Sequence, residues 1–560
     1  MPGLVDGHTH ILNFPWEWGT DRDSTQRLAL QSGITTLAEM AVEPWFVDEM
    51  EQVVRDGKLI IRTSLYLMFV DACGQTTGDW YTQYPPTGVF GEKLRIGGVK
   101  GFAGGGTCGD PAVSVEYSEW HGGGTGDLWF SDAELSRVIA EAHDAGCQVA
   151  IHACGDRAAA TVLSAYDSVL DGQPDTLRHR VEHNTLVRPE SRPLYGQIDP
   201  IPSLMRSAPT CRILRGEGWP SYYGPERVSW IYNYRAILDE NPGLHASWHG
   251  DDPFLVPVSP LVELHGLVTR KEIDDDGTLC EPPSWLEATA LTVEAGLSLM
   301  TIDAAYALYR EDEVGSLKPG KLADLISLSD NPVAIDPDAI KDVEVLMTMV
   351  VGQVEDCETG HEALCPGYDA PPCEHYADDF SDPGSGWTTL DDGDRRAACV
   401  DGEFQILLRA PGTGLLVTPD PLMPEEWQME VDARQLTGDS GSYGLGFGFS
   451  WGESSYQGYQ FRIDPHRQQY MMEKRDRDGT WTTLLDWTDS SAIQQGTASN
   501  HLTVIREGER LKLHVNGVHL ASCYEPSFLG SGRDGGIRAR SQAAAPIEVR
   551  FDNFRVSCAP

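Results

Sequence analysis

Residues 131–183 read SDAELSRVIAEAHDAGCQVAIHACGDRAAATVLSAYDSVLDGQPDTLRHRVEH. Ser131 and Glu134 have the S-x-x-E spacing of a helix capping box, and Gly146 closes the helix that they begin. Apolar runs and 3.6-residue periodicity then follow one another twice. Helix and strand in alternation are typical of βα units built around a parallel sheet. The stretch predicts a helix over 132–145, a strand over 148–153, a helix over 157–170 and a strand over 180–183.

The same alternation extends from residue 1 to about residue 310. Seven or eight such units in roughly 300 residues favour a (β/α)₈ TIM barrel over a doubly wound sheet, and we assign residues 1–310 to this barrel. No glycine-rich phosphate-binding fingerprint opens a helix. The other candidate strands are Leu4–His8, Ile34–Glu39, Ile60–Val70, Gly98–Phe102 and His245–His249.

The pattern changes after the barrel. Residues 311–355 contain short β-rich runs and predict a small β appendage, and residues 356–375 have the Pro, Gly and acidic composition of a linker. From residue 376 to 560 apolar residues alternate with polar ones at period two, and Asn516-Gly517 is a strong hairpin signal. Many short strands predict an all-β sandwich. The chain is therefore expected to be multidomain.

Composition narrows the classes of partner. The 560 residues include 42 Lys and Arg against 85 Asp and Glu, a formal charge of −43, which disfavours nucleic acid as a partner. No apolar run is long enough for a transmembrane segment. Six of the 12 cysteines follow residue 356, which favours disulfides over a zinc site because no C-x-x-C pair is present. This clustering predicts an extracytoplasmic or cell-envelope location, although the first residues contain no signal peptide.

Several residues with the chemistry of metal ligands fall at the ends of predicted strands. His8 and His10 are two positions apart on a strand and therefore project from one face. In a barrel all strands deliver their carboxyl ends to one mouth, so groups distant in sequence can share a site. A neutral lysine amine can add carbon dioxide and become a carbamate that bridges two cations. The candidate ligands are His8, His10, Lys100, His152, His183 and Asp251.

PGLVDGHTH at residues 2–10, VGSLKPGKLADLI at 314–326 and this order of ligands resemble the metal-dependent amidohydrolase superfamily. VAIHACGDRAA and RHRVEHN are similar to its YtcJ-like (amidohydrolase 3) branch, and the likeness covers about residues 1–355. The resemblance implies a hydrolase of non-peptide carbon–nitrogen bonds in a small-molecule substrate. Two divalent ions, expected to be zinc, would be bridged by carboxylated Lys100, and a hydroxide between the metals would attack. His8, His10 and Asp251 would hold one ion, His152 and His183 the other, and Asp251 would also carry the proton.

Several candidate ligands also have an interpretation in which they only stabilise the fold. Lys100 fits a buried salt bridge, and His152 and His183 fit hydrogen-bonded core positions. Asp252 is an alternative to Asp251, but the family pattern selects the aspartate two before the proline. Cys154 lies on the face of His152, where a small buried apolar role is the simpler interpretation. The residues predicted to contact substrate or to orient the ligands, or else to form ion pairs, are Asp156, Arg157, His179, Arg180, Glu182 and His249.

The C-terminal stretch, from DDFSDPGSGW to FDNFRVS, looks like a concanavalin-like or laminin-G-like jelly roll. Such modules often bind glycans, and glycan contact is therefore a candidate property, with Trp427, Trp451, Trp481 and Trp487 as stacking residues or as core. The resemblance implies strands before the barrel that would pair with residues 311–355, so we expect these residues to be the remnant of a composite sandwich. Either the amino terminus is truncated, which we favour, or a compact barrel has dispensed with those strands, and unpaired edges are then expected in residues 320–355. The alternatives are a glycan-binding protein with a silent barrel, or a metal-dependent deaminase or esterase.

Overall fold

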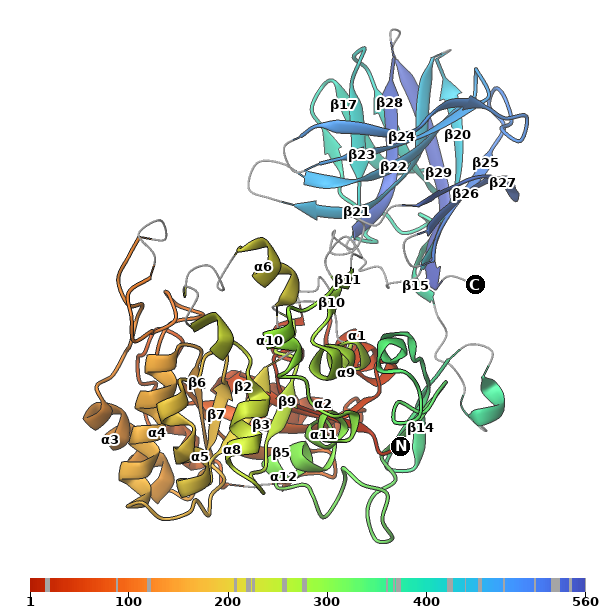
Figure 1. Ribbon diagram of the computed structural model, residues 1–560. Coiled ribbons are helices and arrows are strands. Elements are labelled where there is room, and N and C mark those ends of the chain that lie inside the picture. Colours follow the sequence, from red (N-terminus) through yellow and green to blue (C-terminus); the bar gives the residue numbers. More distant parts are fainter. Residues whose placement is uncertain are drawn as a thin grey trace. The chain divides into compact units, whose positions relative to one another are not determined.

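The computed structural model describes residues 1–15, 21–86, 89–117, 122–205, 209–217, 223, 227–253, 259–273, 279–358, 361–365, 368, 374–419, 427–438, 440–451, 456–476, 479–507, 510–524, 534–542 and 546–558. The chain forms two compact units, Met1–Asp369 and Ala370–Pro560, shown in Figure 1. Much of the predicted linker, residues 359–360, 366–367 and 369–373, lies outside the described residues, as does the side chain of Trp451.

Eight parallel strands form a nearly closed barrel in the first unit, which confirms the predicted fold. Most are buried along their whole length, as expected of parallel strands that are covered by helices on the outside and packed on the inside. The strand order is β1 (Leu4–Thr9), β2 (Ile34–Val42), β3 (Arg62–Met68), β5 (Leu94–Phe102), β6 (Val149–Ala153), β7 (Arg180–His183), β8 (Ile201–Met205) and β9 (Ser247–His249), with the short β4 (Val89–Phe90) antiparallel to β5.

Helices surround the barrel (Figure 1). The predicted capping box is present in α3, where the Ser131 side chain accepts from the Glu134 amide and the Glu134 carboxylate from the Ser131 amide. The α-helices among the described residues of this unit are α1 (Arg22–Gln31), α2 (Pro44–Arg55), α3 (Asp132–Asp144), α4 (Asp156–Leu170), α5 (Pro193–Ile198), α6 (Thr210–Arg215), α8 (Tyr234–Glu240), α9 (Pro260–Thr269), α10 (Ser284–Glu287), α11 (Val293–Leu299) and α12 (Ile302–Ala307).

Two small antiparallel sheets complete the first unit. One joins β10 (Glu272–Ile273) to β11 (Leu279–Cys280), and the other contains β12 (Leu325–Leu328), β13 (Val345–Val350) and β14 (Gln353–Cys357) in that order. The second occupies the predicted appendage. Its β12 edge was expected to be unpaired, but Pro2 bridges Leu325, and Met1 and Ile326 exchange two hydrogen bonds. Asp324, just before β12, forms a fully buried ion pair with Arg62 of β3 at 3.0 Å, which anchors the appendage to the barrel.

Three disulfides lie in the first unit: Cys73–Cys108, Cys211–Cys280 and Cys357–Cys365. Cysteines after residue 356 were expected to pair, and Cys357–Cys365 does so, whereas Cys399 forms no disulfide with any described residue. The first two disulfides were not predicted, because their cysteines are 35 and 69 residues apart with no local pattern. No helix within the described ranges has the length and hydrophobicity needed to cross a bilayer.

The second unit is all-β, as predicted, and consists of two antiparallel sheets that enclose one apolar core. In the predicted hairpin, Asn516 and Gly517 both have positive φ, at 51° and 78°, as a two-residue type I′ turn requires. One sheet contains β15 (Glu374–Asp378), β16 (Leu390–Asp391), β17 (Arg395–Val400), β18 (Glu403–Leu408), β20 (Trp427–Thr437), β25 (Asn500–Glu507), β26 (Arg510–Val515), β27 (Val518–Tyr524) and β29 (Ile547–Cys558). The other contains β19 (Gly414–Val417), β21 (Gly441–Trp451), β22 (Tyr456–Asp464), β23 (Gln469–Arg475), β24 (Trp481–Asp489) and β28 (Asp534–Ser541).

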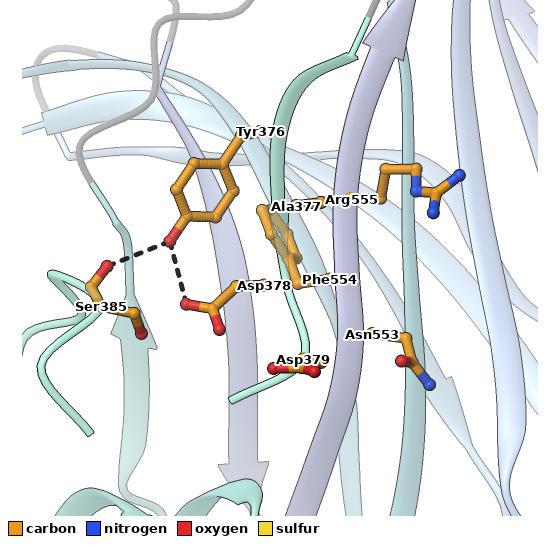
Figure 2. Close-up of a pocket in the computed structure, with 8 residues that line it drawn as sticks. All are labelled: Tyr376, Ala377, Asp378, Asp379, Ser385, Asn553, Phe554 and Arg555. Atoms are coloured by element: carbon orange, nitrogen blue, oxygen red, sulfur yellow. Dashed lines mark hydrogen bonds between the residues drawn. The ribbon is translucent and has the colours of Figure 1, made fainter. Parts of the chain in front are cut away.

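A pocket of about 450 Å³ lies beside β15 and β29 of this unit. Figure 2 shows the Tyr376 hydroxyl directed at the Asp378 carboxylate and at Ser385, and the Tyr376–Asp378 distance is 3.2 Å. Trp427, one of the proposed stacking residues, is buried in the core instead, whereas Trp481 is 38% exposed. Glycan contact therefore stays a prediction. The pocket is lined by Tyr376, Ala377, Asp378, Asp379, Ser385, Asn553, Phe554 and Arg555.

Candidate metal centre

His8 near the end of β1 and His10 just after it lie at the mouth of the barrel. Both are buried, and their ring centroids are 5.3 Å apart. Asp6, two residues earlier on the same face, accepts a hydrogen bond from the His8 amide at 2.9 Å. Burial lowers the pKa of His8 well below its usual value and that of His10 to about 3. Both rings are therefore held in the neutral form that binds metals. The alternation of the strand thus delivers two neutral imidazoles to one place.

Glu182, which forms a buried ion pair with Arg180, fixes the orientation of His8. Glu182 accepts from Nδ1 of His8 at 2.6 Å, which leaves Nε2 directed into the barrel mouth. Arg180 in turn donates to both oxygens of Glu182, at 2.8 and 3.0 Å. Burial alone would raise the pKa of Glu182, but the charges of Arg180 and Lys100 and the hydrogen bond from Arg180 together hold it below its usual value. This is the carboxylate–histidine arrangement that orients metal ligands in proteins.

Asp251 follows β9 and reaches the same histidines. Its Oδ1 lies 3.3 Å from Nε2 of His8 and 3.7 Å from Nε2 of His10, and its Oδ2 lies 3.9 Å from Nδ1 of His183. His8, His10 and Asp251 form one of the groups of described residues whose spacing could hold a metal ion. Asp252 instead uses its backbone carbonyl to accept from the His10 amide. The geometry therefore supports Asp251 over Asp252 as the candidate ligand.

A second group lies beside the first. His152 of β6 and His183 of β7 have ring centroids 4.5 Å apart, and ligand atoms of His152, Cys154 and His183 all lie within 4.8 Å of one another. His8, His183 and His249 form a further such group, in which the His249 ring stacks on His8 at 4.7 Å. His249, interpreted from sequence as a contact rather than a ligand, is therefore part of the histidine cluster itself.

Lys100 ends up among these groups, near the end of β5. Its side chain is buried, lies 4.8 Å from the centre of the Phe102 ring, and its Nζ makes no hydrogen bond to any residue that the structure describes. Burial lowers its pKa to about 8. A buried ammonium without a hydrogen-bond acceptor is costly, whereas an amine converted to a carbamate would direct its charge at bound cations. The donor set thus fits the predicted metal centre.

Three of the predicted residues have other partners. His179 precedes β7 and contacts His143 at 2.9 Å and the Val149 amide at 3.0 Å, at the opposite end of the strands. Asp156 accepts from the Ser114 amide, and Arg157 donates to the carbonyls of residues 125 and 126. His179 therefore stabilises the barrel away from the cluster, and the other two organise the loop that follows β5.

Two buried carboxyl groups near the cluster were not predicted. Asp6 accepts from the His8 amide, and Glu39 of β2 accepts from the amides of Leu12 and Asn13, which fixes the turn after His10. Burial raises the pKa of Asp6 to about 7 and that of Glu39 to about 8. Asp6 carried a signal, since it lies two positions before His8 on the same strand face; Glu39 carried none in its own stretch of sequence.

Comparison with known proteins gives the family. A sequence model of the amidohydrolase family (Amidohydro_3) matches residues 20–355. The chain belongs to this family. Its relatives include LONG AFTER FAR-RED 3 of Arabidopsis thaliana, 31% identical over 252 residues, and YtcJ of Bacillus subtilis, 29% identical over 269 residues. These matches place it in the YtcJ-like branch.

A third relative, the N-substituted formamide deformylase of Arthrobacter pascens, is 28% identical over 240 residues. The match covers 43% of this chain and 40% of the Arabidopsis protein, 48% of this chain and 48% of YtcJ, and 42% of this chain and 41% of the deformylase. The chain therefore spans less than half the length of each relative. Among solved structures, a metal-dependent hydrolase from Pyrococcus horikoshii is 22% identical, with a TM-score of 0.45, over 56% of this chain and 60% of that one.

Proposed function

We propose that this protein is a metal-dependent hydrolase that cleaves a carbon–nitrogen bond, other than a peptide bond, in a small molecule. One observation carries the proposal: histidines from β1, β6, β7 and β9, with Asp251, converge on a buried lysine that has no hydrogen-bond partner among the described residues. Membership of the amidohydrolase family supports the reaction class.

The centre is proposed to hold two ions. His8, His10 and Asp251 would bind one, and His152 and His183 the other, with carboxylated Lys100 as the bridge. Zinc is the proposed metal, because neutral imidazoles and carboxylates are donors that suit it. Bound divalent ions supply Lewis acidity, which polarises a carbonyl and lowers the pKa of a nearby water.

Asp251 is the proposed proton carrier. Its side chain is 17% exposed, more than those of the histidines around it, so its carboxylate can face both the cluster and a bound substrate. It would accept a proton as water adds to the substrate carbonyl and return that proton to the nitrogen as the carbon–nitrogen bond breaks. Glu182 would hold His8 in place throughout, as its 2.6 Å hydrogen bond indicates.

The test combines metal content with turnover. Protein prepared with bicarbonate should contain about two zinc ions per chain by mass spectrometry. It should then be assayed on N-formyl amines, because one relative is a formamide deformylase, and on N-acyl amino acids, cyclic ureides, amino-purines and esters. Faster turnover of an ester or deamination substrate than of every amide would favour the two alternative reactions of this barrel.

Variants separate the residues from the fold. Lys100→Ala should lose most activity and recover part of it with short carboxylic acids, which can occupy the place of the carbamate. Asp251→Asn should lose at least 100-fold in kcat, the scale of a general acid–base group. Lys93→Ala is the matched control, because Lys93 lies just before the same strand and pairs with Glu355 instead. Full activity in both Lys100→Ala and Asp251→Asn would refute the proposed roles.

We also propose an extracytoplasmic location. Three disulfides in the first unit support it, since disulfides persist in oxidising compartments. Alkylation and mass spectrometry of protein from fractionated source cells should find Cys73 and Cys108 linked and the protein outside the cytoplasm. Recovery from the cytoplasm with these thiols reduced would overturn the assignment.

A further inference from the structure

Cys154 is the one sulfur donor in the histidine cluster of the described residues. It follows β6, two positions after His152, so that alternation places both side chains on one face. Its Sγ and the nearest ring nitrogens of His152 and His183 lie within 4.8 Å of one another, and all three residues are at least 96% buried. The three atoms form one of the groups of described residues that could hold a metal ion.

The absence of a side chain at Gly106 leaves room beside His152 and Cys154. A Cβ built on Gly106 would lie 2.8 Å from Nε2 of His152 and 3.2 Å from Sγ of Cys154. The residue has a φ of +130°, a conformation that side chains rarely adopt, so the loop after β5 is shaped to bring bare backbone against these atoms. The Cys73–Cys108 disulfide holds the same loop. The room beside His152 and Cys154 is therefore set by the backbone conformation of this loop.

Cys154 has remained a thiol in a unit that forms three disulfides. Cys147, at the other end of β6, is also buried and free, but it lies outside every described group of candidate ligands. A thiol beside two imidazoles is a soft donor, and two histidines with one cysteine favour zinc, cobalt or cadmium over magnesium or manganese. Of the two buried thiols, Cys154 alone has imidazoles beside it that could share a metal ion.

We propose that Cys154 is a direct ligand of the ion held by His152 and His183. On binding, the sulfur–hydrogen bond is replaced by a sulfur–metal bond and one proton leaves to solvent. The inference rests on the proposed function for the presence of the metal, but it adds a donor that makes this position a His₂Cys site. It also assigns the second ion a preference for thiophilic metals, whereas the ion at His8, His10 and Asp251 has only nitrogen and oxygen donors.

Cobalt(II) loading of the full-length protein tests this directly. A cobalt–thiolate bond gives an intense near-ultraviolet charge-transfer absorption, while nitrogen and oxygen ligands give only the weak visible bands. The wild-type protein should show both. Cys154→Ser and Cys154→Ala should keep the visible bands, lose the charge-transfer band, and bind the second equivalent of cobalt at least ten-fold more weakly. Cys147→Ala, the matched control, should retain the complete wild-type spectrum.

The outcomes are distinguishable. Stoichiometric cobalt with visible bands but no charge-transfer absorption in the wild type would overturn the cysteine ligand and leave the proposed function standing. A charge-transfer band that survives in Cys154→Ala would place the bond on another thiol and would also overturn the inference. Folded wild-type protein that binds no cobalt, zinc or cadmium would remove the metal centre, and the proposed function would fail with it. Circular dichroism of each variant confirms that the protein tested is folded.

Discussion

Replacing Glu182 with glutamine removes the negative charge from an ion pair in which neither side chain has exposed surface. Arg180 would keep hydrogen bonds to the Gly7 carbonyl and the Ser203 hydroxyl but lose its counter-charge. Breaking a buried pair by removing one partner costs about 3–5 kcal/mol of unfolding free energy. Because these two hydrogen bonds remain, we expect a loss near the lower end, about 3 kcal/mol.

The same substitution has a second effect, on metal affinity. Glu182 is the partner of His8 Nδ1, and loss of such an orienting carboxylate weakens metal binding by about 10–100-fold. Urea unfolding with a chelator present measures the first effect, with hydrogen exchange of peptides from β7 to follow the barrel separately from the C-terminal unit. Zinc titration in the absence of urea measures the second.

A double-mutant cycle supplies the control. Arg180→Met alone should also destabilise the barrel, because it leaves the Glu182 charge buried without its partner. The double variant removes both charges, and we expect its loss to be about 1–3 kcal/mol smaller than the sum of the two single losses. Stability of Glu182→Gln within about 1 kcal/mol of wild type, together with unchanged zinc affinity, would refute the role assigned to this pair.

Three further perturbations have defined outcomes. Gly106→Ala places a Cβ 2.8 Å from Nε2 of His152 and should weaken binding of the second metal equivalent at least ten-fold in a zinc titration, whereas Gly122→Ala, also at positive φ but in open space, should not. Asp324→Asn leaves its fully buried arginine partner without a counter-charge and should cost about 3–5 kcal/mol in urea unfolding of the barrel unit. His501, hydrogen-bonded to two carboxylates, has a pKa raised to about 9, so its stabilisation is complete below pH 6.5 and disappears as pH rises through 9. Thermal unfolding of His501→Gln should therefore differ from wild type by about 0.5–1 kcal/mol at pH 6 and by nothing at pH 10, since the site is partly exposed.

Seven of the eight barrel strands were predictable, several of them because burial on both faces produces apolar runs, although β7 has the polar sequence RVEH. The eighth, β8, was missed because its sequence IPSLM contains Pro202, which ordinarily disfavours an interior strand. In the structure Pro202 pairs with Val181 at the edge of the short β7–β8 ladder. A proline inside a short strand therefore hides that strand from a reading based on residue preferences.

The candidate site was predictable in composition but not in arrangement. Strand ends identified His8, His152 and Asp251, because parallel strands share one mouth. His249 was placed outside the ligand set, since sequence cannot show that its ring stacks on His8. His179 was grouped with its neighbours in sequence although it lies at the opposite end of β7, where Val149 donates to it. Whether a charged residue reaches the cluster thus depends on which end of the strand it occupies, even when it is close to a ligand in sequence.

The first and last strands of the barrel meet at a seam that two backbone hydrogen bonds hold at the mouth. The amide of His10 donates to Asp252, and that of Asp251 donates to His8. The groups joined here are more than 240 residues apart in sequence, so this contact closes a long loop and is costly in chain entropy. An ion bound by His8, His10 and Asp251 would have ligands from both ends of the barrel sheet. Its binding free energy would therefore stabilise the closed barrel. Without a bound ion, the contact between β1 and the residues after β9 should be the first part of the barrel to open.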